Sequence, residues 1–150
     1  ITKLMINNIK FIYIKNNFDK RGFFAEILRL SNFAENFKKA QISHSRVKKN
    51  ILKGWHGHKL QNQWNYVSRG NILLVLYDNN PLSSTYKKFV KKKIGHNFEN
   101  SAYFFSPGIL HSYKCISNFA DIIYITSDIY DPINEIKINL NNKKIKYEWK

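Results

Sequence analysis

Short runs of β-branched and aromatic residues recur along the chain, separated by clusters of Asn, Gly, Pro and Asp. Such runs are typical of β-strands, and such clusters are typical of turns. We expect loops over residues 16–22 and 78–85 and a helical turn over 31–39. The expected strands cover residues 9–14, 23–28, 40–47, 51–58, 63–77, 86–93, 101–105, 111–116 and 121–130. This pattern predicts an all-β fold, closed into a jelly roll or barrel, because closure removes open sheet edges.

Length and composition predict one domain over residues 1–150. A chain of this length that is 43% hydrophobic and 15% aromatic can bury a sizeable core. Its single cysteine, Cys115, excludes a disulfide framework and suits a reducing compartment, so we expect a cytoplasmic protein. Nothing resembles a signal peptide, and no apolar run approaches the length of a membrane span, so no membrane partner is expected.

The charge balance indicates an anionic partner. The chain carries 25 Lys and Arg residues against 10 Asp and Glu residues, a formal net charge of +15. Nucleic acid, an anionic membrane surface or a phosphorylated small molecule would each fit this excess. Much of it lies in Lys-rich stretches such as residues 86–93, which are typical of a solvated strand face. We therefore expect no nucleic-acid partner; such a partner would make binding depend steeply on salt.

Two histidines, His56 and His58, lie in one expected strand. Side chains alternate between the faces of a strand, so both imidazoles point into the same space. A Pro-Gly turn at residues 106–109 then delivers a third histidine, His111, to the start of another strand. The simpler alternative is that these histidines only line a polar barrel mouth above an aromatic core.

Three imidazoles and the side-chain oxygen of Gln63 could hold a divalent first-row metal. A neutral amide is a weaker ligand than a carboxylate, however. We therefore expect no metal and no other cofactor.

Two segments resemble the paired motifs of the cupin superfamily. The first is His56-x-His58 followed by Gln63 and Gly70, and the second is P-G-x-x-H, which ends at His111. In cupins the two motifs meet inside a β-barrel. The resemblance therefore implies a cupin jelly-roll barrel, with these side chains and Tyr124 facing one cavity.

A closer resemblance runs along nearly the whole chain, to the dTDP-4-dehydrorhamnose 3,5-epimerase family. These are metal-free cupins that act on dTDP-4-keto-6-deoxy sugars. Five segments resemble the family's motifs, in the same order along the chain. They are residues 19–26 (D-x-R-G-F-F-x-E), 41–46 (Q-x-N-x-S-x), 53–56 (R-G-L-H), 107–111 (P-x-G-x-x-H, matched less exactly by P-G-x-x-H) and 124–135 (Y-K-x-T-x-Y-Y-x-P-x-x-E).

The resemblance implies that His56 is the catalytic base and Tyr124 the proton donor. It implies a dTDP-linked keto-sugar as ligand and a homodimer as the assembly. Lys53 stands for a phosphate-binding Arg and Ser43 for an Asn. The expected binding residues are Arg21, Glu26, Gln41, Ser43, Lys53, His58, Gln63, His111 and Glu135.

The chemistry of these two residue types fits that reaction. A carbon next to a ketone loses its proton only if a base is in reach and the enolate is stabilised, and inversion needs a proton from the opposite face. An imidazole titrates near neutrality and can serve as the base. A tyrosine with an ordinary pKa of ~10 is protonated and can donate.

The chain departs from the family at two places. Gln63 stands where the family has a Lys that stabilises the enolate oxygen, and the chain ends before the family's Asp that orients the catalytic His. We therefore expect weaker activity than in members that keep both residues.

Two other functions remain open. Residues 54–59 followed by Gln61 resemble the G-x-H-A-H-K segment of sugar 3,4-ketoisomerases, in which both histidines would move protons. A non-catalytic cupin that binds a nucleotide sugar or a metal is the third possibility.

Overall fold

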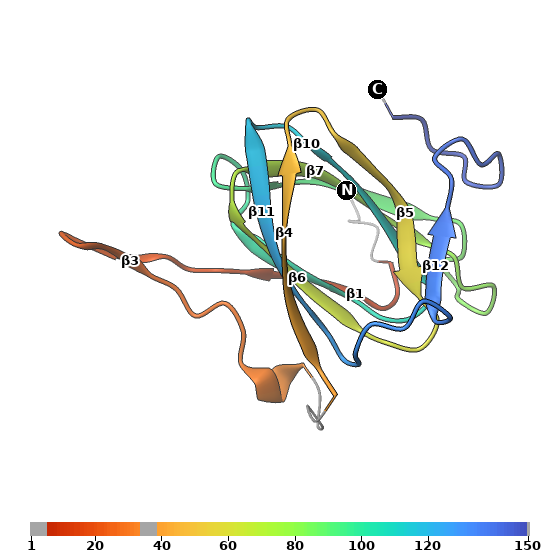
Figure 1. Ribbon diagram of the computed structural model, residues 1–150, viewed down its shortest axis with the longest axis horizontal. Coiled ribbons are helices and arrows are strands. Elements are labelled where there is room, and N and C mark those ends of the chain that lie inside the picture. Colours follow the sequence, from red (N-terminus) through yellow and green to blue (C-terminus); the bar gives the residue numbers. More distant parts are fainter. Residues whose placement is uncertain (1–5, 34–38, 150) are drawn as a thin grey trace.

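Two antiparallel five-stranded sheets face each other and form the barrel (Figure 1). The computed structural model describes residues 6–33 and 39–149. The first sheet has the order β1 (Ile9–Tyr13), β9 (Ser101–Phe105), β6 (Gln63–Arg69), β11 (Phe119–Thr126) and β4 (Gln41–Lys48). The second has the order β12 (Glu135–Ile138), β5 (Leu52–His58), β10 (Ile109–Cys115), β7 (Asn71–Asp78) and β8 (Phe89–Gly95). The predicted all-β jelly roll is confirmed.

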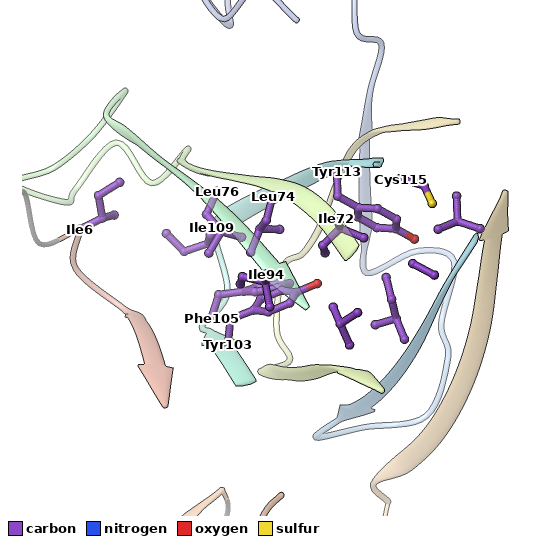
Figure 2. Close-up of a cluster of buried hydrophobic side chains, with 14 residues drawn as sticks. Ile6, Ile72, Leu74, Leu76, Ile94, Tyr103, Phe105, Ile109, Tyr113 and Cys115 are labelled. Atoms are coloured by element: carbon purple, nitrogen blue, oxygen red, sulfur yellow. The ribbon is translucent and has the colours of Figure 1, made fainter. Parts of the chain in front are cut away.

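The main core lies between the two sheets (Figure 2). Alternate residues of β7, among them Leu74 and Leu76, pack there with Tyr103 and Phe105 of β9. Val75 and Tyr77 of β7 belong to a second buried cluster, which includes Ile145 from the C-terminal segment. Every residue of β7 is buried, which explains why this strand reads as a continuous apolar run rather than an alternating one.

The single strand expected over residues 63–77 is wrong. Gly70 has a φ of +78°, and a Cβ there would lie 2.1 Å from the carbonyl oxygen of Phe119. This left-handed residue ends β6 and starts β7, and the two strands belong to opposite sheets. The break therefore carries the chain from one wall of the barrel to the other.

Other expected boundaries also need correction. Residues 16–22 contain a hairpin strand rather than only a loop, because Asp19 accepts the N–H of Arg21 at 2.7 Å and closes a tight turn between β2 (Asn17–Asp19) and β3 (Gly22–Phe24). The strand expected over 23–28 ends at Phe24, and the helical turn is a 3-10 helix, Leu30–Asn32. Residues 34–38 of that expected turn lie outside the described residues.

In the second half of the chain, β8 begins at Phe89 rather than 86. Ser83 and Thr85 donate to one carboxylate oxygen of Asp78, and these bonds hold the preceding residues in turns. Strand β11 stops at Thr126, whose hydroxyl donates to the carbonyl of Asp128. Strand β12 was not expected at all, since it is only four residues long.

The β2–β3 hairpin projects away from the barrel (Figure 1). Three of its aromatic side chains, Phe18, Phe23 and Phe24, are 75%, 51% and 71% exposed. Large apolar side chains in such a cluster on a projecting hairpin are typical of an interaction surface. No helix in the described part of the chain is long and apolar enough to cross a membrane.

Candidate active site

A cavity of about 540 Å³ opens between the two sheets. Its volume falls within the usual range for a small-molecule site. Residues from both sheets line it: Gln41, Ser45, Arg46, Lys53, Gly54, Trp55, His56, His58, Gln61, Gln63, Asn65, Tyr103, His111, Tyr113, Ile122, Tyr124, Thr126, Tyr130, Glu135, Lys137 and Ile138.

A β-bulge in β5 brings Lys53 and His56 to the cavity together. Residues three apart in a regular strand face opposite sides. Here His111 of β10 lies opposite His56, but Tyr113, only two residues later, lies opposite Lys53. The extra residue on β5 restores the inward direction of Lys53.

His56 has a partner on each ring nitrogen. Its Nε2 lies 2.9 Å from Oε1 of Glu135, and its Nδ1 lies 3.2 Å from Nε2 of His111. A carboxylate is only an acceptor, so Nε2 of His56 carries the proton of that bond. In neutral His56, Nδ1 is then the basic nitrogen and accepts the Nε2–H of His111.

His111 is buried, and burial lowers its pKa well below the usual value. The ring is therefore neutral and carries a single N–H. Its Nδ1 has no hydrogen-bond partner in the described part of the chain. A buried donor without a partner is rarer than a buried acceptor without one, which agrees with the proton being on Nε2.

His58 belongs to a chain of hydrogen bonds whose direction is fixed at one end. The amide nitrogen of Asn65 donates to the carbonyl of Tyr103 at 3.4 Å, so its oxygen faces Gln63 and accepts from that amide at 2.6 Å. The oxygen of Gln63 must then accept Nε2–H of His58 at 2.7 Å. Gln61 completes the chain by donating to Nδ1 of His58 at 3.1 Å.

This chain leaves His58 neutral with both nitrogens occupied. Desolvation is the main cause of its lowered pKa, and the bond to Gln63 opposes that shift only in part. The side chain is 4% exposed. His58 is therefore held as an oriented neutral group and does not exchange protons freely.

Tyr124 enters the cavity from the opposite sheet. Alternate residues of β11, namely Ile122, Tyr124 and Thr126, all line it. In the register of the sheet Tyr124 lies between Ser43 of β4 and Asn65 of β6. Tyr124 and His56 therefore approach the same space from opposite walls.

The charged groups of the lining are mostly cationic. Lys53, Arg46 and Lys137 line the cavity, and among the described residues Glu135 is the only acidic one that does so. Arg46 is also held by Asp121, which accepts two bonds from its guanidinium at 2.7 Å each. This excess of positive charge suits an anionic ligand.

Comparison with known proteins identifies the family of this chain. The family model for dTDP-4-dehydrorhamnose 3,5-epimerase matches residues 3–150. The chain belongs to this family. The dTDP-4-dehydrorhamnose 3,5-epimerase of Salmonella typhimurium is 30% identical over 139 residues, which cover 87% of this chain and 75% of that protein. The spore coat polysaccharide biosynthesis protein SpsL of Bacillus subtilis is 29% identical over 150 residues, 97% of each chain.

Solved structures of epimerases share the fold. NovW, a 4-keto-6-deoxy sugar epimerase from Streptomyces spheroides, superposes with a TM-score of 0.85 at 25% identity, over 98% of this chain and 77% of its own. The enzyme RmlC of Legionella pneumophila, solved with dTDP-4-keto-L-rhamnose, gives a TM-score of 0.85 at 25% identity, over 97% and 80%. The family is thus one of isomerases built on the cupin fold.

Most of the residues that the family resemblance assigns to the site meet in the cavity. His56, His58, Gln63, His111, Tyr124, Lys53, Gln41 and Glu135 all line it. Gln41 accepts the backbone N–H of Tyr130 at 3.0 Å and donates to Ser43 at 3.0 Å. Ser43 is not among the lining residues but supports one of them.

Arg21 and Glu26 do not reach this cavity. Arg21 lies at the tip of the β2–β3 hairpin, 83% exposed, and bonds to Asp19. Glu26 bonds to Arg29 at 2.8 Å and lines a separate cavity of about 220 Å³. Within one copy of the chain, these two residues therefore do not contact a ligand bound in this cavity.

Several cavity residues were not assigned to the site by the sequence analysis, among them Asn65, Tyr103, Tyr113 and Lys137. Three of them lie two residues beyond an expected site residue in the same strand. Asn65 follows Gln63, Tyr113 follows His111 and Lys137 follows Glu135. The period of two along a strand was the signal that would have found them.

Within the described residues, no group of three or more His, Cys, Asp or Glu side chains is arranged to hold a metal. The imidazoles instead hydrogen-bond to one another, to Gln61 and Gln63 and to Glu135. The expectation of a site without a metal or cofactor stays a prediction.

Proposed function

We propose that this protein epimerises a dTDP-4-keto-6-deoxy sugar, by removing and returning a proton at a carbon beside the ketone. The observation that carries the proposal is the placement of His56 and Tyr124 on opposite walls of one cavity. Inversion requires a base on one face of the sugar and a proton donor on the other.

In the proposed reaction Nδ1 of His56 takes the proton from carbon. To do so, Nδ1 gives up its hydrogen bond from His111 and faces the substrate carbon instead. The Nε2–H of His111 is then free, 3.2 Å from the base, to donate to the adjacent ketone oxygen as negative charge develops there. Tyr124 delivers a proton to the opposite face, and exchange with solvent resets His56 and Tyr124.

Binding would rest on the cationic lining. Lys53 and Gln41 are proposed to bind the nucleotide diphosphate, since an ammonium makes charge-assisted hydrogen bonds to phosphate oxygens. His58 and Gln63 would present an ordered, neutral wall to the sugar. The ligand bound to the Legionella relative, dTDP-4-keto-L-rhamnose, supports this substrate class.

The proposed assembly is a homodimer in which the β2–β3 hairpin contacts the second copy. The exposed phenylalanines of the hairpin support this, because they find no cover within one copy. Such a contact would bring Arg21 and Glu26 close to the cavity of the second copy. We further propose that residues 1–150 act as one domain in the cytoplasm, where the buried, unpaired Cys115 stays reduced.

The decisive experiment follows dTDP-4-keto-6-deoxyglucose by NMR in D₂O with the wild-type protein. Deuterium entering at C3, at C5 or at both, with appearance of the inverted sugar, supports epimerisation and identifies the carbon. Absence of exchange with every dTDP-4-keto sugar tested, despite measurable binding, would leave a binding protein instead.

A ketoisomerase is the second candidate, because His56 and His58 lie side by side with ring centroids 5.1 Å apart. That reaction would need His58 to move a proton. Both of its nitrogens are held by amide side chains, and burial disfavours its charged form. The geometry therefore favours the epimerase, and formation of a 3-keto sugar in the same NMR experiment would favour the ketoisomerase.

A further inference from the structure

Glu135 contacts the proposed base directly. Its Oε1 lies 2.9 Å from Nε2 of His56, and its side chain is 9% exposed. The other carboxylate oxygen accepts a bond from Nζ of Lys137 at 2.9 Å. Both oxygens are thus occupied by neighbours on the wall of the cavity.

The sheet, rather than a loop, holds this carboxylate. Strand β12 pairs with β5 so that Glu135 lies opposite His58 and Lys137 opposite His56. Cross-strand partners share a face, so both β12 side chains point toward the imidazoles. Ile136, between these two residues, and Ile138, after them, pack against the second buried cluster and hold the strand in place.

Of the three imidazoles in the cavity, only that of His56 is hydrogen-bonded to a carboxylate of the described residues. His58 bonds to the amides of Gln61 and Gln63, and His111 bonds to His56. A carboxylate beside an imidazole fixes the nitrogen that carries the proton and stabilises the imidazolium that forms. This placement singles out His56 as the imidazole that can take up a proton.

We propose that Glu135 is a positioning residue for His56, acting through the imidazole instead of binding the sugar nucleotide. It holds the proton on Nε2, leaves Nδ1 basic, and stabilises the imidazolium after proton abstraction. The proposal rests on the proposed function, since it takes His56 as the base. It also differs from the binding role that the family resemblance implies for Glu135.

Other charged and titratable groups share the cavity with His56. The titratable and charged residues that line the cavity with it are His58 and Lys53 on β5, His111 and Tyr113 on β10, Glu135 and Lys137 on β12, Tyr124 and Arg46 on the opposite sheet, Tyr103 and Tyr130. Among these described lining residues Glu135 is the only acid, so Glu135→Gln removes the one negative charge of the lining.

The test compares Glu135→Gln with the wild type, first without substrate. The imidazole signals of His56, assigned with His56→Ala, are followed by NMR against pH. We expect the midpoint of the His56 titration to move to lower pH in Glu135→Gln, because the imidazolium has lost its counter-charge, and Glu135→Asp to restore it in part. The control Glu148→Gln, at an exposed position, should leave the midpoint unchanged.

Kinetics then separate positioning from binding. We expect Glu135→Gln to lower kcat on the order of 10²-fold or more and to move the acid limb of kcat/KM to lower pH, while dTDP binding stays unchanged. Weaker dTDP-sugar binding with an unmoved His56 titration would overturn the proposal and assign Glu135 to the substrate. If the wild type shows no exchange, the proposed function fails, yet the titration without substrate still decides whether Glu135 acts on His56.

Discussion

His56 and Tyr124 line one cavity from opposite sheets, His56 from β5 and Tyr124 from β11. A sugar ring held between the walls would present one face to each side chain. Proton removal and proton delivery are separable in this arrangement, because each step depends on a different wall. Substitutions at the two positions should therefore have different effects.

His56→Ala should abolish deuterium exchange at the sugar, with a loss of about 10²–10⁴-fold, whereas Tyr124→Phe should retain exchange and lose inversion. The base is absent in the first variant, while in the second only delivery to the opposite face is missing. NMR in D₂O measures both outcomes, and calorimetry with dTDP checks that binding persists. Equal loss of exchange in the two variants would show that Tyr124 also takes part in proton removal.

Gln63→Glu should raise the pKa of His58 above its wild-type value. In the wild type, burial lowers that pKa, and the neutral oxygen of Gln63 opposes the shift only in part. A carboxylate in the same place would attract the proton more strongly. Gln63→Met should have the opposite effect, because it removes the acceptor of the His58 Nε2–H.

The pH dependence of the His58 imidazole signals in NMR measures both variants of Gln63. Opposite displacements of the midpoint are the expected result. A midpoint that moves in the same direction in both would mean that the Gln63 oxygen is not the acceptor, and that the hydrogen-bond chain runs in the other direction.

Loss of the hairpin's aromatic surface should weaken the proposed dimer. Phe23→Ser and Phe24→Ser remove two exposed apolar side chains without touching either main core cluster. Light scattering over a dilution series should show dissociation at higher concentration than for wild type, with activity falling in parallel. The control Leu82→Ser changes an apolar residue that is 94% exposed elsewhere and should have no effect. A wild type that is monomeric at all concentrations would remove the dimer proposal.

The local part of the site was predictable from the sequence. The same-face placement of His56 and His58 follows from the period of two along a strand. Lys53 reaches the same face only because of the β5 bulge, and the spacing of residues in the sequence does not predict that bulge. The contact between His56 and Glu135 joins residues 79 positions apart and depends on a four-residue strand with little hydrophobic pattern.

The fold class was likewise predictable, but the crossing between sheets was not. Residues 63–77 were expected as one strand although polar residues and a glycine, Ser68-Arg69-Gly70-Asn71, interrupt the apolar run. What ends β6 is the close approach of the Phe119 carbonyl, a contact with a strand far along the chain. Such an interruption is compatible with a bulge in one strand or with two strands, and the tertiary contact decides between them.

Asp121→Asn should remove part of the acid sensitivity of folding. The guanidinium of Arg46 is the main cause that lowers the pKa of Asp121 from 3.8 to about 2. A group whose pKa is lower in the folded state stabilises it above the unfolded pKa, and that stabilisation is lost as the pH falls through the folded value. The free energy of unfolding of the wild type should therefore fall toward that of Asp121→Asn between pH 4 and 2.

Urea denaturation at a series of pH values measures this effect. In Arg46→Met the free energy of unfolding should depend less on pH over the same range, because the substitution removes the main cause of the lowered pKa of Asp121. A constant difference between wild type and Asp121→Asn from pH 6 to about 2 would show that Asp121 is not stabilised by its charge.

Gly57→Ala should destabilise the barrel by about 1–3 kcal/mol, the usual cost of overpacking. Gly57 lies between the two site histidines, and an added Cβ would lie 2.6 Å from the carbonyl oxygen of Ile109 and 2.9 Å from Cδ2 of Leu110. The first of these atoms is backbone in the neighbouring strand β10, so β5 must move for the methyl group to fit. That movement would also shift His56 and His58, so exchange activity should fall even where the protein stays folded.

Gly54→Ala is the matched control on the same strand. Its Cβ would meet only Cγ of Leu140 at 3.5 Å and the carbonyl oxygen of Ile138 at 3.7 Å, which are ordinary contacts. Because both variants change the flexibility of the unfolded chain alike, the difference between their free energies of unfolding isolates the steric effect. Thermal and urea denaturation should give Gly57→Ala a clearly lower free energy of unfolding than Gly54→Ala. Equal stabilities would mean that β5 and β10 separate easily, and the precise placement of the His56–His111 pair would then need another support.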